Sequence, residues 1–194
     1  RGGNAMKRLL VRWSPLVAAA VVSLGGGALY GQQRISADNL APFVPTPEPV
    51  VEKMLEAAEL KPGEMLFDLG CGDGRILFLA AQRFRAKAVG VELSPKLVAQ
   101  VREKARQLGL QDQVKVAEGN LLEVDLRPAD VVTLYLLRLS NERLKPNLRK
   151  QLRPGARVVS HDYEIMGWKP LRVEKVMVHE RAHAIYVYRM PPTE

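Results

Sequence analysis

The stretch FDLGCGDGRILFLA, residues 67–80, decides the fold of this chain. It sets Gly70, Gly72 and Gly74 at alternate positions, directly behind the apolar run MLFDL (65–69) and ahead of a helix-like run. Glycines in a turn between a buried strand and a helix let the backbone approach a ligand closely, because no side chain intervenes. In open α/β sheets such turns lie at the ligand-binding edge. The stretch therefore predicts a parallel sheet with a binding crevice at this loop.

The rest of the chain alternates between strand-like and helix-like runs. Strands are predicted at 65–69, 88–93, 114–118, 130–137, 156–162, 173–178 and 184–188. Helices are predicted at 47–58, 75–84, 95–108 and 141–151, with Thr46 and Ser94 as N-caps. Apolar strands that alternate with helices are typical of a parallel sheet covered on both sides. We expect an α/β, Rossmann-like fold with a seven-stranded, mostly parallel sheet and helices on both faces.

The spacing of the loop argues against a phosphorylated coenzyme. The nicotinamide fingerprint is G-x-G-x-x-G, whereas the spacing here is G-x-G-x-G, and Arg75 stands where that fingerprint needs glycine or alanine. No Gly-Lys-Ser/Thr follows, so the triphosphate-binding pattern fails as well. Neither a pyrophosphate nor a triphosphate is favoured.

Polar residues at the strand ends suit a different nucleoside. Glu92 ends the second predicted strand, where a carboxylate can accept hydrogen bonds from both ribose hydroxyls. Asn120 follows the third strand and could hydrogen-bond an adenine edge. Asp68 and Asp73 favour a positively charged ligand group. A ligand with ribose, adenine and a cationic end, but no phosphate chain, is S-adenosylmethionine.

On these residues the chain resembles the class I S-adenosylmethionine-dependent methyltransferases across residues 45–190. It departs from them at Asn120, where that superfamily usually has aspartate. The segments FVPTPEPVVEKML, DVVTLYLL, LRPGARVVSHDY and GW are similar to bacterial relatives of the membrane-anchored protein-lysine methyltransferases that modify ATP synthase c-subunit and adenine nucleotide translocase. The resemblance implies the class I methyltransferase fold and a lysine acceptor in an unidentified protein. It also implies that Thr46 and Pro47 form a lid over the cofactor.

Candidate catalytic residues follow the fourth and fifth predicted strands. Tyr135 is expected to shape the acceptor channel, and His161 or Asp162 to orient or deprotonate the amine; the alternative is a structural hydrogen bond at the strand end. Methyl transfer needs no metal, and no metal site is expected. HERAH, 179–183, satisfies the H-E-x-x-H zinc pattern, but strand-like runs flank it. We therefore expect a hairpin turn there rather than a zinc-binding helix.

The front of the chain has a different character. Residues 1–5 precede the first methionine and are interpreted as a cloning scar or upstream read-through. Residues 6–34 combine a basic start with 19 uncharged residues, which predicts a hydrophobic helix serving as membrane anchor or signal. Residues 35–44 are expected to be a linker, and 45–194 the methyltransferase domain. The expected location is at a membrane, on a side that the sequence leaves open.

Charge and composition narrow the classes of partner. Of the net charge of +8, the first 34 residues contribute +5, so +3 remains for the other 160. The basic balance is therefore weak support for nucleic-acid binding, and no nucleic-acid partner is expected. The single cysteine, Cys71, excludes an intrachain disulfide.

Two other functions remain open beside lysine methylation. The first is a methyltransferase for a small-molecule, lipid or quinone-like acceptor. The second is a non-catalytic module that binds an adenosine ligand.

Overall fold

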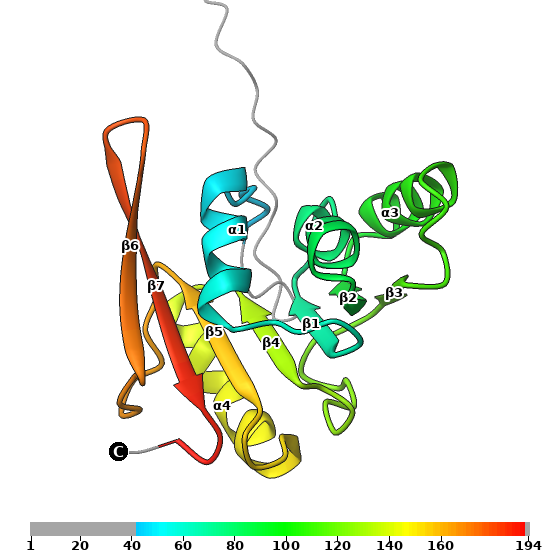
Figure 1. The fold of residues 1–194 in the computed structure, drawn as a ribbon. Helices are drawn as coiled ribbons and strands as arrows, with labels where there is room; N and C mark the ends of the chain where they lie inside the picture. Colours follow the sequence, from blue (N-terminus) through cyan, green and yellow to red (C-terminus); the bar gives the residue numbers. More distant parts are fainter. Residues whose placement is uncertain (1–41, 193–194) are drawn as a thin grey trace, which may run out of the picture. The chain divides into compact units, whose positions relative to one another are not determined.

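The computed structural model describes residues 42–192, which contain one seven-stranded sheet with the strand order β3-β2-β1-β4-β5-β7-β6 (Figure 1). The strands are β1 Met65–Leu69, β2 Lys87–Glu92, β3 Val114–Glu118, β4 Val131–Leu134, β5 Arg157–His161, β6 Arg172–Val178 and β7 Arg181–Arg189. The first five pair in parallel, and β7 runs antiparallel to both β5 and β6. The predicted mostly parallel sheet of seven strands is confirmed.

Helices cover both faces of this sheet. They are α1 Glu48–Ala57, α2 Arg75–Phe84, α3 Pro95–Gln107 and α4 Arg138–Gln151. Successive residues of a strand point to opposite faces, so Val131 packs with α1, α2 and α3, while its neighbour Val132 packs with Leu144 and Leu148 of α4. The central strands β1, β4 and β5 are buried on both faces, which explains why their sequences are largely apolar.

Several element bounds differ from the sequence prediction. The strand expected at 130–137 ends at Leu134. The helix expected at 141–151 begins earlier, at Arg138, and contains Pro146. Ser94 caps α3 as predicted, because its Oγ accepts the Leu97 N–H at 3.4 Å. The predicted cap at Thr46 is wrong, since Pro47 is the residue that precedes α1 and no side chain caps that helix.

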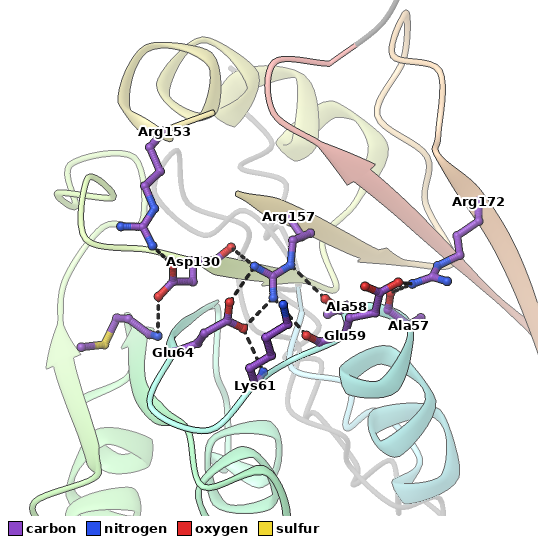
Figure 2. A network of polar contacts seen from close by, with 10 residues as sticks. Ala57, Ala58, Glu59, Lys61, Glu64, Asp130, Arg153, Arg157 and Arg172 are labelled. Atoms are coloured by element: carbon purple, nitrogen blue, oxygen red, sulfur yellow. Dashed lines mark hydrogen bonds and ion pairs between the residues drawn. The ribbon is translucent and has the colours of Figure 1, made fainter. Parts of the chain in front are cut away.

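A polar network joins the amino ends of β1, β4 and β5, at the edge of the sheet opposite the glycine loop (Figure 2). Arg157 donates to both carboxylate oxygens of Glu64, at 3.0 and 2.6 Å, and to the backbone carbonyls of Ala58 and Glu59. The Asp130 carboxylate accepts the Met65 N–H at 2.9 Å. The side chain of Arg157 is 13% exposed, so this cation is well shielded from water. It ties the end of α1 to three neighbouring strands.

The predicted membrane association is corrected. A bilayer span needs about 20 apolar residues, and across residues 42–192 no helix is long and apolar enough to cross one. The longest helix there, α4, has 14 residues and carries several charges. The expected location at a membrane therefore has no support in this part of the chain. Three predictions fall outside the described residues: the hydrophobic helix within 6–34, the interpretation of residues 1–5, and positions 35–41 of the linker expected at 35–44.

Candidate functional site

A cavity of about 340 Å³ opens at the carboxyl edge of the parallel strands. Pockets for small ligands have volumes of about 300–1,000 Å³. The glycine loop, the ends of β2, β3 and β4, and the segment before α1 line it. The predicted site residues among its walls are Thr46, Asp68, Gly70, Gly72, Asp73, Glu92, Asn120 and Tyr135. Residues predicted for a cofactor from four separate parts of the chain thus meet in one cavity.

Two glycines of the loop are required by its geometry. Gly72 has a φ of 54°, and a Cβ built there would lie 2.4 Å from the ring of Phe43. Gly74 has a φ of 76° and directly precedes α2, where a Cβ would lie 3.0 Å from Phe78 and Val101. Side chains are strained at such φ values, and here they would also collide. Gly74 lies outside the cavity wall and packs α2 and α3 against the loop.

The innermost acid of the cavity is Asp68. It is 3% exposed, and its Oδ1 accepts the hydroxyl proton of Thr133 at 2.7 Å. The pKa of Asp68 is raised from 3.8 to about 7, mainly by burial and in smaller part by the nearby charges of Glu92 and Asp73, against the hydrogen bond from Thr133. A carboxylate held in this way gains from a cationic ligand group beside it.

Glu92 and Asn120 occupy the ends of the neighbouring strands. The two carboxylate oxygens of Glu92 accept the backbone N–H groups of Gly72 at 3.0 Å and Ser94 at 2.9 Å. These bonds fix the carboxylate at the cavity wall. The Oδ1 of Asn120 accepts the Leu122 N–H at 3.0 Å, and its amide N–H groups are available as donors at the cavity wall.

The segment Pro42–Thr46 forms one wall of the cavity, and Arg75 holds it there. Arg75 pairs with Asp73 at 2.6 Å and donates to the carbonyl of Thr46 at 2.8 Å. Partial burial alone raises the pKa of Asp73, but hydrogen bonds from Arg75 outweigh it and the pKa is lowered. Arg75 neutralises the charge of Asp73. The acids of the cavity that can interact with a cationic or hydroxyl group of a ligand are therefore Asp68 and Glu92.

Pro47, His161 and Asp162 do not line the cavity. Pro47 precedes α1 instead. His161 is fully buried behind two residues of the wall: its ring centroid lies 3.9 Å from that of Tyr135, and its Nδ1 lies 3.4 Å from the Thr46 hydroxyl. Burial lowers the pKa of His161 to about 4, against the nearby charge of Asp162. In this position His161 lies behind the wall of the cavity, against Tyr135 and Thr46.

Behind the wall, β7 contributes two residues that the sequence analysis did not assign to the site. The Nδ1 of His183 lies 2.9 Å from the Nε2 of His161, and the Nη2 of Arg181 donates to the Oδ2 of Asp162 at 2.7 Å. Asp162 has a φ of 59°, and its other oxygen accepts the Ala184 N–H at 3.0 Å. Both residues belong to HERAH, so this motif was the feature of the sequence that could have identified them.

HERAH itself spans a hairpin, as expected. β6 ends at Val178 and β7 begins at Arg181, so His179 and Glu180 form the two-residue turn, with φ values of 45° and 63°. Both values are positive, as in the turns that suit twisted hairpins. The helical zinc arrangement of a metalloprotease is therefore absent from this hairpin. The thiol of Cys71 is buried, which raises its pKa and makes it a poor nucleophile.

The sheet order, the glycine loop and the acid that ends β2 define a class I S-adenosylmethionine-dependent methyltransferase fold. Residues 68–172 match the family model described as the ANTKMT methyltransferase domain, and the chain belongs to this family. The chain is a methyltransferase whose cofactor is S-adenosylmethionine. The predicted class, enzyme type and cofactor are confirmed.

Two relatives and one solved structure illustrate the likeness. A protein-lysine N-methyltransferase of Saccharolobus islandicus is 46% identical over 148 residues, which are 76% of this chain and 92% of the relative. The mouse adenine nucleotide translocase lysine N-methyltransferase is 34% identical over 74% of this chain and 62% of its own length. An RNA methyltransferase from Salinibacter ruber, solved with S-adenosyl-L-homocysteine, is 44% identical with a TM-score of 0.71, over 76% of this chain and 94% of that one.

Proposed function

We propose that this enzyme transfers the methyl group of S-adenosylmethionine to the side-chain amine of a protein lysine. The observation that carries the acceptor class is the 46% identity to the archaeal protein-lysine N-methyltransferase, which extends over 92% of that protein. The mouse relative is also named for a lysine acceptor in a protein.

The cofactor assignment follows the chemistry of the cavity. Asp68 would meet the ammonium group of the methionine part, and Glu92 the ribose hydroxyls. Because the Oδ1 of Asn120 is already bonded, its amide would donate to a ring nitrogen of adenine, where an aspartate would accept from the exocyclic amine. Phe43 and Thr46, from the wall segment, would cover the ligand.

The acceptor would enter beside Tyr135, which is half-buried at the end of β4 and lines the cavity. The ring of Tyr163 lies 6.3 Å from that of Tyr135, at an interplanar angle of 28°. Aromatic faces attract a lysine ammonium group until it loses its proton. We assign Tyr135 to the acceptor channel, and His161 the role of a positioning residue that supports Tyr135 and Thr46 from behind.

The reaction is an in-line displacement. The lysine ammonium first releases a proton to solvent; its nitrogen lone pair then forms the N–CH₃ bond as the S–CH₃ bond breaks, and the sulfur keeps the bonding electrons. Positioning of the amine and the methyl carbon, about 3–3.5 Å apart and aligned, would supply most of the rate enhancement.

The test uses purified protein, methyl-labelled S-adenosylmethionine and cell extract. Label that survives acid and RNase, disappears with protease and migrates as methyllysine after hydrolysis supports the proposal. RNase-sensitive label would favour an RNA acceptor, as in the solved relative from Salinibacter ruber. Label in the organic phase would favour a lipid or quinone-like acceptor, and donor binding without any turnover would favour a binding module. Each of these three outcomes contradicts the lysine assignment.

A paired variant tests the position of the acceptor channel. Tyr135→Ala should lower methylation of protein at least about tenfold while leaving the affinity for S-adenosylhomocysteine within a factor of two to three. Tyr186→Ala is the matched control, because Tyr186 is a half-buried tyrosine of β7 outside the cavity wall. Equal losses in both variants would contradict the role given to Tyr135.

A further inference from the structure

Three metal-ligating side chains converge behind the cavity wall. They are His161 at the end of β5, Asp162 directly after it, and His183 near the start of β7, and one ligand atom of each lies within 4.8 Å of the others. The side chains are 0%, 13% and 5% exposed, respectively. The cluster is therefore enclosed and fixed by the sheet, unlike an acidic patch on a surface.

The separations of the three donor atoms match one face of a tetrahedral metal site. The Nε2 of His161 lies 2.9 Å from the Nδ1 of His183 and 3.4 Å from the Oδ2 of Asp162, and the last two atoms are 3.5 Å apart. Zinc–ligand bonds of about 2.0–2.2 Å place tetrahedral ligands about 3.3–3.6 Å from each other. Two of the three donor–donor distances already fit this range, and the two imidazole nitrogens must separate by roughly 0.4 Å to reach it.

The surroundings orient these donors as a metal site requires. Ligating histidines usually direct their second ring nitrogen at a hydrogen-bond partner, and the Nδ1 of His161 faces the Thr46 hydroxyl at 3.4 Å. The Oδ1 of Asp162 accepts the Ala184 N–H at 3.0 Å, which leaves Oδ2 directed at the two imidazoles. Two facing imidazole nitrogens at 2.9 Å share a single proton, and a metal ion would replace that proton.

We propose that His161, Asp162 and His183 bind a divalent transition-metal ion of the zinc type, with water as the fourth ligand. Two imidazoles and one carboxylate are donors that suit zinc and its neighbours better than magnesium or calcium. Arg181 is the built-in competitor: it occupies the Oδ2 of Asp162 at 2.7 Å, and its side chain is 61% exposed, so it can leave for solvent.

The ion would act on the methyltransferase site through the wall. It would fix the ring of His161, whose centroid lies 3.9 Å from that of the tilted Tyr135 ring and whose Nδ1 faces the Thr46 hydroxyl. It would also join the end of β5 to β7, the pair that closes this part of the sheet. The assigned role is to hold the wall in place, with no contact to the methyl donor or the acceptor, and metal binding can be measured without methyl transfer.

The test is titration of the metal-free protein with Zn²⁺ against a fluorescent chelator, and with Co²⁺ followed by its visible absorption. We expect one ion per chain, tetrahedral-type Co²⁺ bands and a raised midpoint of thermal unfolding. His183→Asn should weaken binding about 100-fold or more, and Arg181→Met should strengthen it several-fold. The matched control is His179→Asn, because the chain's third histidine is exposed in the hairpin turn and should not alter binding.

Several outcomes would overturn the proposal. These are no one-to-one binding in the native chain, an affinity unchanged in His183→Asn, or an affinity lost in His179→Asn. Circular dichroism establishes whether His183→Asn is folded; if it is not, Arg181→Met decides, since removal of the guanidinium frees the Oδ2 of Asp162 for the ion and should strengthen binding. Equal or weaker binding in Arg181→Met would contradict the assignment.

Discussion

Asp68 couples proton binding to cofactor binding, and replacing it with asparagine should separate the two. Burial raises the pKa of Asp68 from 3.8 to about 7. At pH 6 about one chain in eleven then carries the ionised carboxylate, and at pH 8 about ten in eleven. If the cationic end of the cofactor binds the ionised form, its affinity should rise about tenfold between pH 6 and pH 8.

The same pKa shift lowers the stability of the cofactor-free fold at neutral and alkaline pH. A group whose pKa is raised on folding stabilises the fold at low pH, and that contribution is lost as pH rises, here between about pH 4 and pH 7. A shift from 3.8 to about 7 corresponds to on the order of 4 kcal/mol above that window. Asp68→Asn keeps an acceptor for Thr133 and cannot ionise. We expect the variant to be more stable at pH 8, by about 2–4 kcal/mol, while it binds the cofactor more weakly.

Calorimetry with S-adenosylhomocysteine tests the affinity, and urea unfolding tests the stability. Titrations at pH 6 in two buffers of different ionisation enthalpy should reveal the release of nearly one proton per ligand bound by the native chain, and none attributable to this site in Asp68→Asn. Every other titratable group is shared by the two proteins, so the difference between them isolates Asp68. An affinity that is flat from pH 6 to pH 8, or the same pH dependence in the variant, would refute the reasoning.

Three further substitutions test the network, the strand-end acid and the loop. Arg157→Met should lower the free energy of unfolding by about 2–4 kcal/mol, because a shielded carboxylate and several carbonyls lose their hydrogen-bond donor. The control is Arg153→Met, which should lower it by less than about 1 kcal/mol because the Arg153 side chain is 57% exposed. Similar losses for the two variants in urea unfolding would contradict the role of the network (Figure 2). Glu92→Gln should weaken S-adenosylhomocysteine binding about tenfold, with exposed Glu118→Gln at the end of β3 as the unaffected control in calorimetry. Gly74→Ala should destabilise the fold by about 1–3 kcal/mol through its φ of 76° and its close neighbours, and a thermal midpoint equal to that of the native chain would contradict this.

The sheet and the cofactor side of the site could be predicted from sequence because their signals are local. The glycine loop has a distinctive spacing, and each polar residue of the cavity follows an apolar run whose carboxyl end must meet the others at one edge. The end of β4 was placed three residues too late because Tyr135, Leu136 and Leu137 are apolar enough to extend the strand. The chain leaves the sheet there, and Tyr135 turns toward the cavity.

Other features depend on contacts between distant residues, which the sequence does not reveal. Thr46 has the composition of a helix cap, yet its hydroxyl faces His161, 115 residues away. Asp73 was expected to offer its charge to the ligand, but Arg75, two residues on, balances it while reaching Thr46. The hydroxyl of Thr46 has a tertiary partner in His161, and Arg75 is held beside Asp73 while it bonds the distant carbonyl of Thr46.

The position of His183 follows from the antiparallel insertion of β7. This strand lies between β5 and β6, and its register sets His161 opposite Ile185, so His183 lies just beyond the end of β5, beside Asp162. Side chains alternate between faces, so a slip of one residue in that register would turn His183 to the opposite face of the sheet and leave two of the three donors together. The two-residue turn at His179 and Glu180 fixes the register of β6 with β7. HERAH therefore contributes to the cluster through the geometry of its hairpin, and its H-E-x-x-H spacing has no part in the arrangement.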